Sequence, residues 1–328
     1  MRQGAKASPV SPIILVTGAS GFIGRSLCRT FLARGFRVRA AIRSSNAIAS
    51  LPRGVSVSIV GDIGPSTDWQ EALKEPLHAV VHLAARAHRL RDDAADPEAE
   101  FHRVNALGTH RLAEATLGHA RRFVFVSSIA AVSSCADDVI DERTPCRPQT
   151  PYGRSKLAAE RLLHEVADGT SMETVVVRPP AVYGPDNPGR FAQLFRLVAA
   201  EYPLPLGGLR NRRSFIYVEN LVDALVRAVT HPAAAGETFV VSDGEDVSVS
   251  QLVEMVARQM GRRVRLWPAP ERLLKLGGRV LRKTTLVDSV IGSLAIDASK
   301  FRRMLAWNPP ICFEHAMNET TRLLRNVA

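Results

Sequence analysis

Tyr152 and Lys156 stand four positions apart after Pro151, a spacing that places both side chains on one face of a helix. A phenol with its ordinary pKa of about 10 is a poor acid or base at neutral pH. A neighbouring ammonium favours the ionised phenol and lowers this pKa, so the pair could move a proton. Ser128 follows an apolar run and could hold a substrate oxygen together with Tyr152. Such pairs are common on helix surfaces, so their meaning depends on the surrounding motifs.

A glycine-rich segment from Thr17 to Gly24 reads TGASGFIG and has the spacing G-x-x-G-x-x-G. Such glycines let the chain turn tightly, let backbone N–H groups approach a pyrophosphate, and let a helix pack close to the preceding strand. Taken alone, the segment could be merely a tight turn. Because it follows the apolar run Ile13 to Val16 and precedes a helical pattern, it predicts dinucleotide binding. The residues expected to line the cofactor here are Gly18, Ser20, Gly21, Phe22, Ile23 and Gly24.

The type of residue at the end of the second expected strand indicates which of the two nicotinamide cofactors, NAD or NADP, the chain binds. An acidic residue there accepts from a ribose 2′-hydroxyl, whereas an arginine pairs with a 2′-phosphate. This chain has Arg43 and Ser44 and no carboxylate at that point, which favours NADP over NAD, although Arg43 could also be a solvated arginine of a basic protein. Asp62, next to Ile63, could accept from the adenine amino group or could instead cap a turn.

The first half of the chain alternates short β-branched runs with longer helical patterns, which indicates a parallel sheet covered by helices. Right-handed crossovers place the helix starts beside the carboxyl ends of the strands, where ligands bind in this architecture. We therefore expect an α/β fold with a doubly wound Rossmann sheet. The expected strands are 13–17, 37–42, 55–60, 78–82, 122–126 and 174–177, and the expected helices include 25–34, 101–117 and 154–167.

Prolines and glycines interrupt this pattern after Arg178. We expect a flexible tail over residues 1–12, a Rossmann domain over 13–178, and a smaller α/β region over 179–328 that mainly binds substrate, some of whose segments return to the Rossmann core. The elements expected in this region are helices 191–200, 221–230 and 250–260 and strands 214–218 and 238–241. A basic, leucine-rich stretch over 268–283 could lie against a membrane surface, but an ordinary amphipathic helix is the simpler interpretation.

The composition is that of a globular protein, with 46% hydrophobic and 23% charged residues among 328, and it excludes disorder and collagen-like structure. The chain shows neither an apolar run of bilayer length nor an export signal. The four cysteines are scattered without a C-x-x-C pair, so we expect a cytoplasmic protein without a metal site or disulfides. Lys and Arg total 43 against 32 Asp and Glu, a net charge of +11 that fits an anionic partner or simply a basic proteome.

A series of motifs in order along the chain resembles an extended short-chain dehydrogenase/reductase of the nucleotide-sugar epimerase, dehydratase and reductase branch. The motifs are TGASGFIG at 17, GD at 61, HLAA at 82, VNALGT at 104, VSS at 126, PYGRSK at 151, RPPAVYGP at 178 and RRSFIYVENLVDAL at 212. They extend from Ile13 to about Pro310. The set is specific for the superfamily and much less specific for the reaction.

The resemblance implies a role for each matching residue. Tyr152 would be the acid/base, and Lys156 would bind the nicotinamide ribose and lower the pKa of Tyr152. Ser128 would bind the substrate oxygen, Arg213 the substrate diphosphate, and Asn105 would stiffen the site beside the cofactor. The other residues that would line the cofactor are Ile63, Leu83, Ala84, Ala85 and Pro179.

Two departures from the branch concern the reaction. Ser128 is followed by Ile129 and Ala130, where the 4,6-dehydratases carry an Asp-Glu pair that performs the elimination, so we do not expect dehydration. Typical 4-epimerases carry a V-Y-G sequence where this chain has Val132 to Ser134, so the loop over the sugar is expected to differ. The identity of the sugar therefore stays open.

Two reactions at C4 of a UDP-linked hexose or N-acetylhexosamine fit the motifs. A 4-keto-reductase delivers one hydride and needs an exchanging NADPH, whereas a 4-epimerase removes a hydride, returns it to the other face, and retains its cofactor. Arg43 favours the reductase, and the motifs as a whole favour the epimerase. Either would serve the synthesis of surface polysaccharide precursors, and the resemblance also implies a homodimer.

Two further interpretations stay open. The sugar could be carried on a polyprenyl diphosphate, or the chain could be a non-catalytic, NADP-sensing or RNA-binding Rossmann protein. A binding protein has no need of Ser128, Tyr152 and Lys156 together, and the sequence lacks aromatics interleaved with basic residues. We therefore expect an enzyme with a small-molecule substrate and no nucleic-acid partner.

Overall fold

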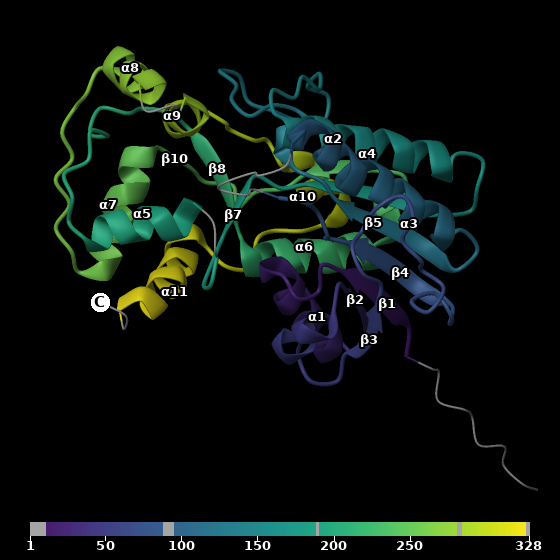
Figure 1. The fold of residues 1–328 in the computed structure, drawn as a ribbon. Helices are drawn as coiled ribbons and strands as arrows, with labels where there is room; N and C mark the ends of the chain where they lie inside the picture. Colours follow the sequence, from purple (N-terminus) through teal and green to yellow (C-terminus); the bar gives the residue numbers. More distant parts are fainter. Residues whose placement is uncertain (1–10, 88–94, 188–189, 281–283, 326–328) are drawn as a thin grey trace, which may run out of the picture.

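A seven-stranded sheet organises the computed structural model, which describes residues 11–87, 95–187, 190–280 and 284–325 (Figure 1). Its order is β3-β2-β1-β4-β5-β6-β9, and its pairings are parallel throughout. The strands are β1 (Ile13–Thr17), β2 (Arg37–Ile42), β3 (Ser56–Ile59), β4 (Leu77–His82), β5 (Ala120–Val126), β6 (Glu173–Arg178) and β9 (Thr238–Val240). The order reverses between β1 and β4, which is the point where a doubly wound sheet binds its ligand. The predicted Rossmann fold is confirmed. Most of the predicted N-terminal tail lies outside the described residues.

Helices cover both faces of this sheet. Apolar residues of α1 (Phe22–Ala33), α6 (Val218–Thr230) and α10 (Ser299–Leu305) share one core with the strands. Residues of α3 (Gly108–Thr116) and α4 (Pro151–Ala167) form the core on the other face. We call the sheet with these helices the Rossmann lobe.

One continuous helical segment leads into α3. It begins with α2 (Pro97–Phe101), passes through a π-helical turn, η2 (His102–Leu107), and continues as α3. Asp96 caps the start by accepting from Ala99 N at 3.0 Å, and Pro97 occupies the first turn, where its missing N–H costs nothing. The predicted helix over 101–117 therefore begins four residues earlier than expected.

The strand predicted over 238–241 is present as β9, and it is one of the segments after residue 178 that return to the Rossmann sheet. β9 pairs in parallel with β6, with Thr238 opposite Val176, and extends the Rossmann sheet. Its Phe239 and Val240 are fully buried. The physical reason is that α6 packs against α1 beneath the sheet and carries the chain back to the open side of β6.

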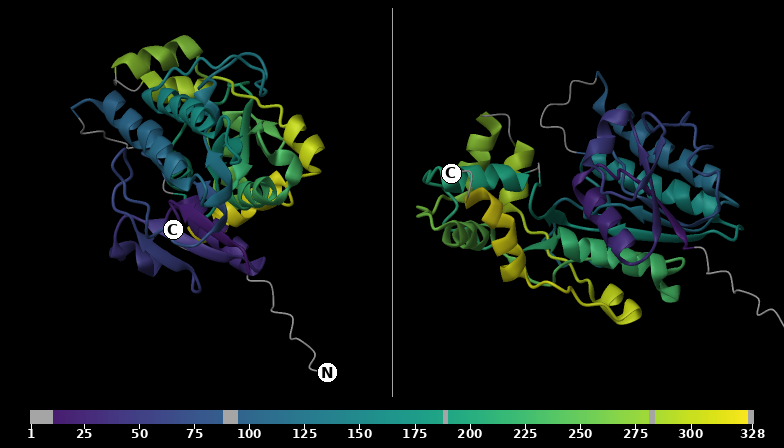
Figure 2. Two further views of the ribbon diagram at one scale, coloured as in Figure 1. Left: turned by 90° about the vertical axis from the view of Figure 1, so that its right-hand side faces the viewer. Right: turned by 90° about the horizontal axis from the view of Figure 1, so that it is seen from below.

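A three-stranded sheet of order β10-β8-β7 forms the second lobe, which lies beside the Rossmann lobe in the right-hand view of Figure 2. Here β7 (Ala181–Tyr183) pairs in parallel and β10 (Asp246–Val247) antiparallel with β8 (Arg213–Tyr217). The helices of this lobe are α5 (Arg190–Ala199), α7 (Val249–Met260), α8 (Glu271–Val280), α9 (Thr284–Ile291) and α11 (Phe313–Arg325). Elsewhere in the described part of the chain lie short 3₁₀ helices, namely η1 (Ser45–Ser50), η3 (Ile129–Ala131) and η4 (Pro232–Ala234). The boundary expected at residue 178 stays a prediction.

Candidate active site

The glycine-rich loop joins β1 to α1 and leaves no room for side chains. Gly18 has a φ of +66°, and a Cβ there would lie 2.8 Å from Ala84 N. A Cβ at Gly24 would overlap the Gly18 carbonyl oxygen, while Gly21 N donates to that oxygen at 3.0 Å. No side chain among the described residues caps α1 at Gly21, so the first N–H groups of the helix are available to an anion. The loop fits the pyrophosphate of a dinucleotide.

The structure brings together two residues that were predicted to contact different parts of the cofactor's adenosine. Arg43 Nε lies 2.6 Å from Asp62 Oδ1, and the two side chains are 72% and 70% exposed. An ion pair this exposed contributes little stability, so a ligand can replace either partner at small cost. Ile63 follows Asp62 and packs against Gly108 at the start of α3. Ser44 begins the turn that enters η1.

His82 ends β4 and joins three elements through buried hydrogen bonds. Its Nδ1 lies 2.6 Å from Thr17 Oγ1, and its Nε2 lies 3.0 Å from Thr109 Oγ1. Because Thr109 donates its hydroxyl proton to Asn105 O at 2.6 Å, it must accept from His82 Nε2. Thr17 Oγ1 also accepts from Ala84 N at 3.1 Å, which fixes the start of the segment Leu83 to Ala85. The ring is therefore held in one tautomer.

The charge state of His82 follows from its surroundings. Burial, and secondarily the nearby Lys156, lower the pKa of His82 to about 3, and the side chain is fully buried. His82 is thus neutral at physiological pH and connects β1, β4 and α3 as a neutral hydrogen-bonding group.

Asn105 lies in the π turn and is 1% exposed. Its Oδ1 accepts from Arg86 N at 2.7 Å, and its Nδ2 donates to Arg86 O at 3.0 Å and to Ser155 Oγ at 2.9 Å. Ser155 Oγ in turn donates to Tyr152 O at 2.8 Å. Asn105 therefore links the chain after β4 to the start of α4, and the stiffening role expected for it stays a prediction.

Ser128 and Tyr152 meet at the carboxyl end of β5. Thr150 caps α4 by accepting from Gly153 N at 3.0 Å, and Gly153 packs against the Ala130 carbonyl so closely that a Cβ would overlap it. This contact brings the start of α4 against the segment that carries Ser128. Burial raises the pKa of Tyr152 to about 12, and a hydrogen bond from Ser128 acts in the opposite direction. The serine therefore stabilises the ionised phenol.

Lys156 is 2% exposed, and its Nζ donates to Val126 O at 2.8 Å. The ammonium also lies 4.5 Å from the centroid of the Phe125 ring. Burial lowers the pKa of Lys156 to about 7, while Glu160 acts in the opposite direction. The lysine is therefore fixed to β5 one helical turn from Tyr152, with a charge that changes near neutral pH.

Reasoning from the sequence missed a buried ion pair behind Lys156. Arg178 Nη2 lies 2.5 Å from Glu160 Oε2, Arg178 Nε lies 3.0 Å from Glu160 Oε1, and Ser127 Oγ also donates to that carboxylate. Both charged side chains are less than a tenth exposed. The signal was the position of Glu160, which stands four residues after Lys156 and so shares its helix face.

Arg213 lies in the second lobe, on β8. Its Nη1 donates to Gly292 O at 2.7 Å, directly after α9, and its side chain is half-buried. Asn211, two residues before β8, donates to Val290 O at 2.8 Å and to Gly292 O at 3.0 Å, so both side chains join the start of β8 to the end of α9. Pro179, at the end of β6, accepts from Ile129 N at 2.9 Å and helps to fix the loop after Ser128.

Among the residues that the structure describes, no group of His, Cys, Asp and Glu side chains could hold a metal ion. No helix in this part of the chain is long and apolar enough to cross a bilayer.

Comparisons with known proteins agree over both lobes. Residues 14–242 match the NAD dependent epimerase/dehydratase family. The chain is 36% identical over 330 residues to a UDP-glucose 4-epimerase of Vibrio cholerae, covering 98% of each protein. It is 27% identical to the N-acetyl-alpha-D-glucosaminyl-diphospho-ditrans,octacis-undecaprenol 4-epimerase of Escherichia coli O157:H7, over 86% of this chain and 84% of that protein. The structure of MoeE5 in complex with UDP-glucuronic acid and NAD superimposes with a TM-score of 0.77 at 27% identity, over 96% of this chain and 99% of that one.

Proposed function

Because the chain belongs to the NAD dependent epimerase/dehydratase family and is an enzyme of that family, we propose that it is a 4-epimerase of a UDP-linked hexose or N-acetylhexosamine. The observation that carries the proposal is the hydrogen bond between Ser128 and Tyr152, one helical turn from the buried Lys156. The identity to the Vibrio cholerae UDP-glucose 4-epimerase supports the substrate class. Synthesis of surface polysaccharide precursors and a homodimeric state remain part of the proposal.

Tyr152 takes the proton of the substrate C4 hydroxyl and later returns it. Ser128 binds the same oxygen and keeps it within reach of the phenol. Lys156 binds the nicotinamide ribose, and the hydrogen bond from Ser128 lowers the pKa of Tyr152 from the high value that burial imposes. A bound nicotinamide cofactor supplies the site that accepts a hydride from C4 and gives it back. Neighbouring Ile129 and Ala130 carry no group that could perform an elimination, which supports epimerisation over dehydration.

The residues around Arg43 support a second candidate, a 4-keto-reductase that exchanges NADPH. The end of β2 presents a guanidinium where an NAD site typically presents a carboxylate. NADP preference is therefore part of the proposal, although MoeE5, a similar structure, is described in complex with NAD.

Cofactor choice is tested by removing the guanidinium. If Arg43 pairs with a 2′-phosphate, Arg43→Ala should weaken NADPH binding by about 1.5 to 3 kcal/mol and barely change NADH binding. Arg53→Ala is the matched control, because Arg53 is an exposed arginine that was not expected to contact the cofactor, and it should change neither affinity. Both affinities are measured by nicotinamide fluorescence. Equal losses for the two cofactors, or a native preference for NADH, would remove the main support for the reductase.

The reaction itself is tested with purified protein and UDP-glucose, UDP-galactose and their N-acetylated counterparts. We expect interconversion at C4 without added cofactor, and NAD or NADP released when the protein is denatured. Oxidation of NADPH when a UDP-4-keto sugar is added, with no interconversion of the UDP-sugars, would establish the reductase instead. Turnover of a polyprenyl-diphosphate sugar with neither reaction on UDP-sugars would move the substrate toward that of the Escherichia coli relative.

A further inference from the structure

Helix α8 turns its apolar side away from the protein. Leu273, Leu276 and Val280 are 59%, 55% and 75% exposed, and their spacing of three and four residues places them on one face. The side that packs against the lobe is formed instead by Leu274, which joins the second lobe's core, and by the buried Gly278. An ordinary surface helix buries its apolar stripe, so this orientation is reversed.

Cations border the exposed apolar face. Arg272, Lys275 and Arg279 are exposed and, at 100° per residue, lie along one edge of the stripe. Glu271 is the one acidic residue of the helix, all of whose residues the structure describes. Long basic side chains in this position can bind phosphates while their stems follow apolar surface.

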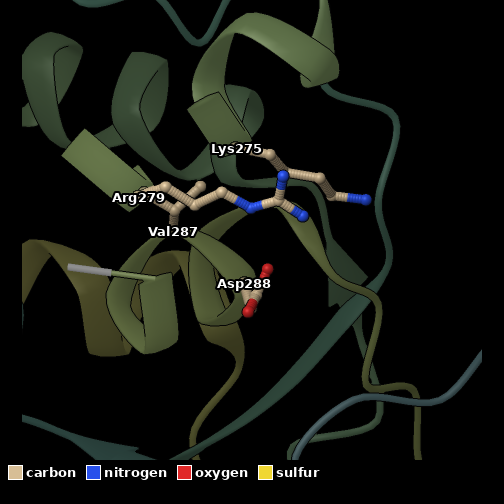
Figure 3. Close-up of a pocket in the computed structure, with 4 residues that line it drawn as sticks. All are labelled: Lys275, Arg279, Val287 and Asp288. Atoms are coloured by element: carbon tan, nitrogen blue, oxygen red, sulfur yellow. The ribbon is translucent and has the colours of Figure 1, made fainter. Parts of the chain in front are cut away.

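Two of these cations face a small hollow between α8 and α9. It has a volume of about 240 Å³ and is lined by Lys275, Arg279, Val287 and Asp288. Figure 3 shows the Lys275 and Arg279 side chains extending to the same side, above Asp288. The lining of the hollow carries two positive charges and one negative charge, and Glu271 Oε2 also lies 3.9 Å from Lys275 Nζ. Arg272, Lys275 and Arg279 still outnumber Glu271 on the helix, which suits an anionic headgroup at its edge.

The position of α8 connects this face to the substrate end of the molecule. The helix lies at the outer edge of the second lobe and packs against α9 (Figure 1). Directly after α9, Gly292 O accepts from Arg213. Trp267, whose side chain is 50% exposed, precedes α8. Its backbone N–H donates to Leu204 O at 3.1 Å and joins the chain before α8 to the lobe.

We propose that α8 docks on the surface of an anionic lipid bilayer. Leu273, Leu276 and Val280 enter the boundary between headgroups and acyl chains, and the three neighbouring cations bind lipid phosphates. Charge complementarity selects this occupant over a second copy of the chain, because two such faces would oppose like charges on proteins of net charge +11. With three exposed apolar side chains on ten residues, the helix gives weak and reversible attachment. The proposal does not rest on the proposed function.

The test is sedimentation of the full chain with vesicles. We expect binding to vesicles of phosphatidylcholine with phosphatidylglycerol, weaker binding at higher salt, and little binding to pure phosphatidylcholine. Replacing Arg272, Lys275 and Arg279 together by Gln should lower the affinity about fivefold per charge, and so by about a hundredfold. Leu276→Ser with Val280→Ser should lower it at least about tenfold.

A matched control is Ile59→Ser, which removes an apolar side chain of 54% exposure on the Rossmann lobe and should leave vesicle binding unchanged. Circular dichroism checks that each variant is folded. Equal binding to neutral and anionic vesicles, or unchanged binding of the α8 variants, would overturn the proposal. A dimer without lipid that Leu276→Ser dissociates would assign the face to a second copy. Because the readout requires no turnover, it is independent of the epimerase assay.

Discussion

The two lobes present functional side chains to the proposed substrate in different ways. In the Rossmann lobe, Lys156 and Asn105 are 2% and 1% exposed, and their polar atoms are bonded to strands and helices on several sides. In the second lobe, Arg213 is half-buried on a strand of five residues, and α8 exposes its apolar face. The side chains proposed for proton transfer therefore stand in a buried framework bonded on several sides, whereas the elements proposed for the substrate end are more exposed.

The largest expected effect is at Tyr152. Tyr152→Phe removes the phenol oxygen and little else, so we expect turnover to fall by at least about a hundredfold while the fold and cofactor binding persist. Tyr202→Phe, on a tyrosine that is 60% exposed in the second lobe, is the control and should change nothing. Initial rates with the UDP-sugar substrate and a cofactor titration check both variants. Near-normal turnover of Tyr152→Phe would refute its assignment as acid/base.

Breaking the ion pair behind Lys156 should affect stability most. Arg178→Met leaves Glu160 buried without its partner, and we expect a loss of about 3 to 5 kcal/mol in the free energy of unfolding by urea. Arg121 also contacts a carboxylate, that of Glu173, but its side chain is 64% exposed. Arg121→Met should therefore cost no more than about 1 kcal/mol. Similar losses for the two variants would contradict the distinction between buried and exposed pairs.

The buried framework should also be sensitive to acid through His82. Its pKa of about 3 in the folded protein lies below the ordinary 6.5, so below pH 6.5 the unfolded chain binds a proton that the folded chain does not. The contribution of His82 to the free energy of unfolding is therefore complete above pH 6.5 and is lost as the pH falls toward 3. Between pH 7 and pH 5 the free energy of unfolding should fall by about 2 kcal/mol because of His82. Urea unfolding of the native protein and of His82→Gln is measured at pH 7 and at pH 5. The difference in the free energy of unfolding between the two pH values should be smaller in the variant. An unchanged pH dependence would mean that His82 is not kept neutral by the fold.

The smallest effect is expected in the second lobe. Arg213→Ala should weaken the UDP-sugar about tenfold, which corresponds to the loss of one charged contact, and leave the cofactor affinity unchanged. Arg212→Ala is the neighbouring control, because Arg212 is exposed and pairs with Asp246 at 2.9 Å. Calorimetric titration with UDP-sugar measures both. An unchanged affinity in Arg213→Ala would show that its contact with Gly292 is purely structural.

Local features of the sequence account for what could be predicted. The six expected strands of the Rossmann sheet are present to within two residues at each end. The alternation of strands and helices can be recognised from patterns of nearby residues. It also predicts that Ser128 and Tyr152 meet at the carboxyl edge of the sheet. Even the start of α2 carried a local signal, the pair Asp96 and Pro97, which reasoning from the sequence did not use.

Features that depend on distant contacts could not be predicted in this way. The pairing of Glu160 with Arg178 and the place of β9 join segments far apart in the chain. The contact between Arg43 and Asp62 likewise requires β2 and the turn after β3 to lie side by side. The strand β7 was missed because the prolines on either side of it indicate irregular structure, although three residues between them suffice to pair with β8.

The late return of β9 has a consequence for synthesis. A nascent chain that has emerged only as far as Arg178 presents β6 as a bare edge and lacks α6, whose Leu221 and Leu225 cover one face of the sheet. Such an edge is a template for pairing with other chains. The Rossmann sheet can be completed by β9 only after β7 and β8 of the second lobe have left the ribosome, so the two lobes fold together. Shortened chains that end near residue 178 should therefore need chaperones to avoid aggregation.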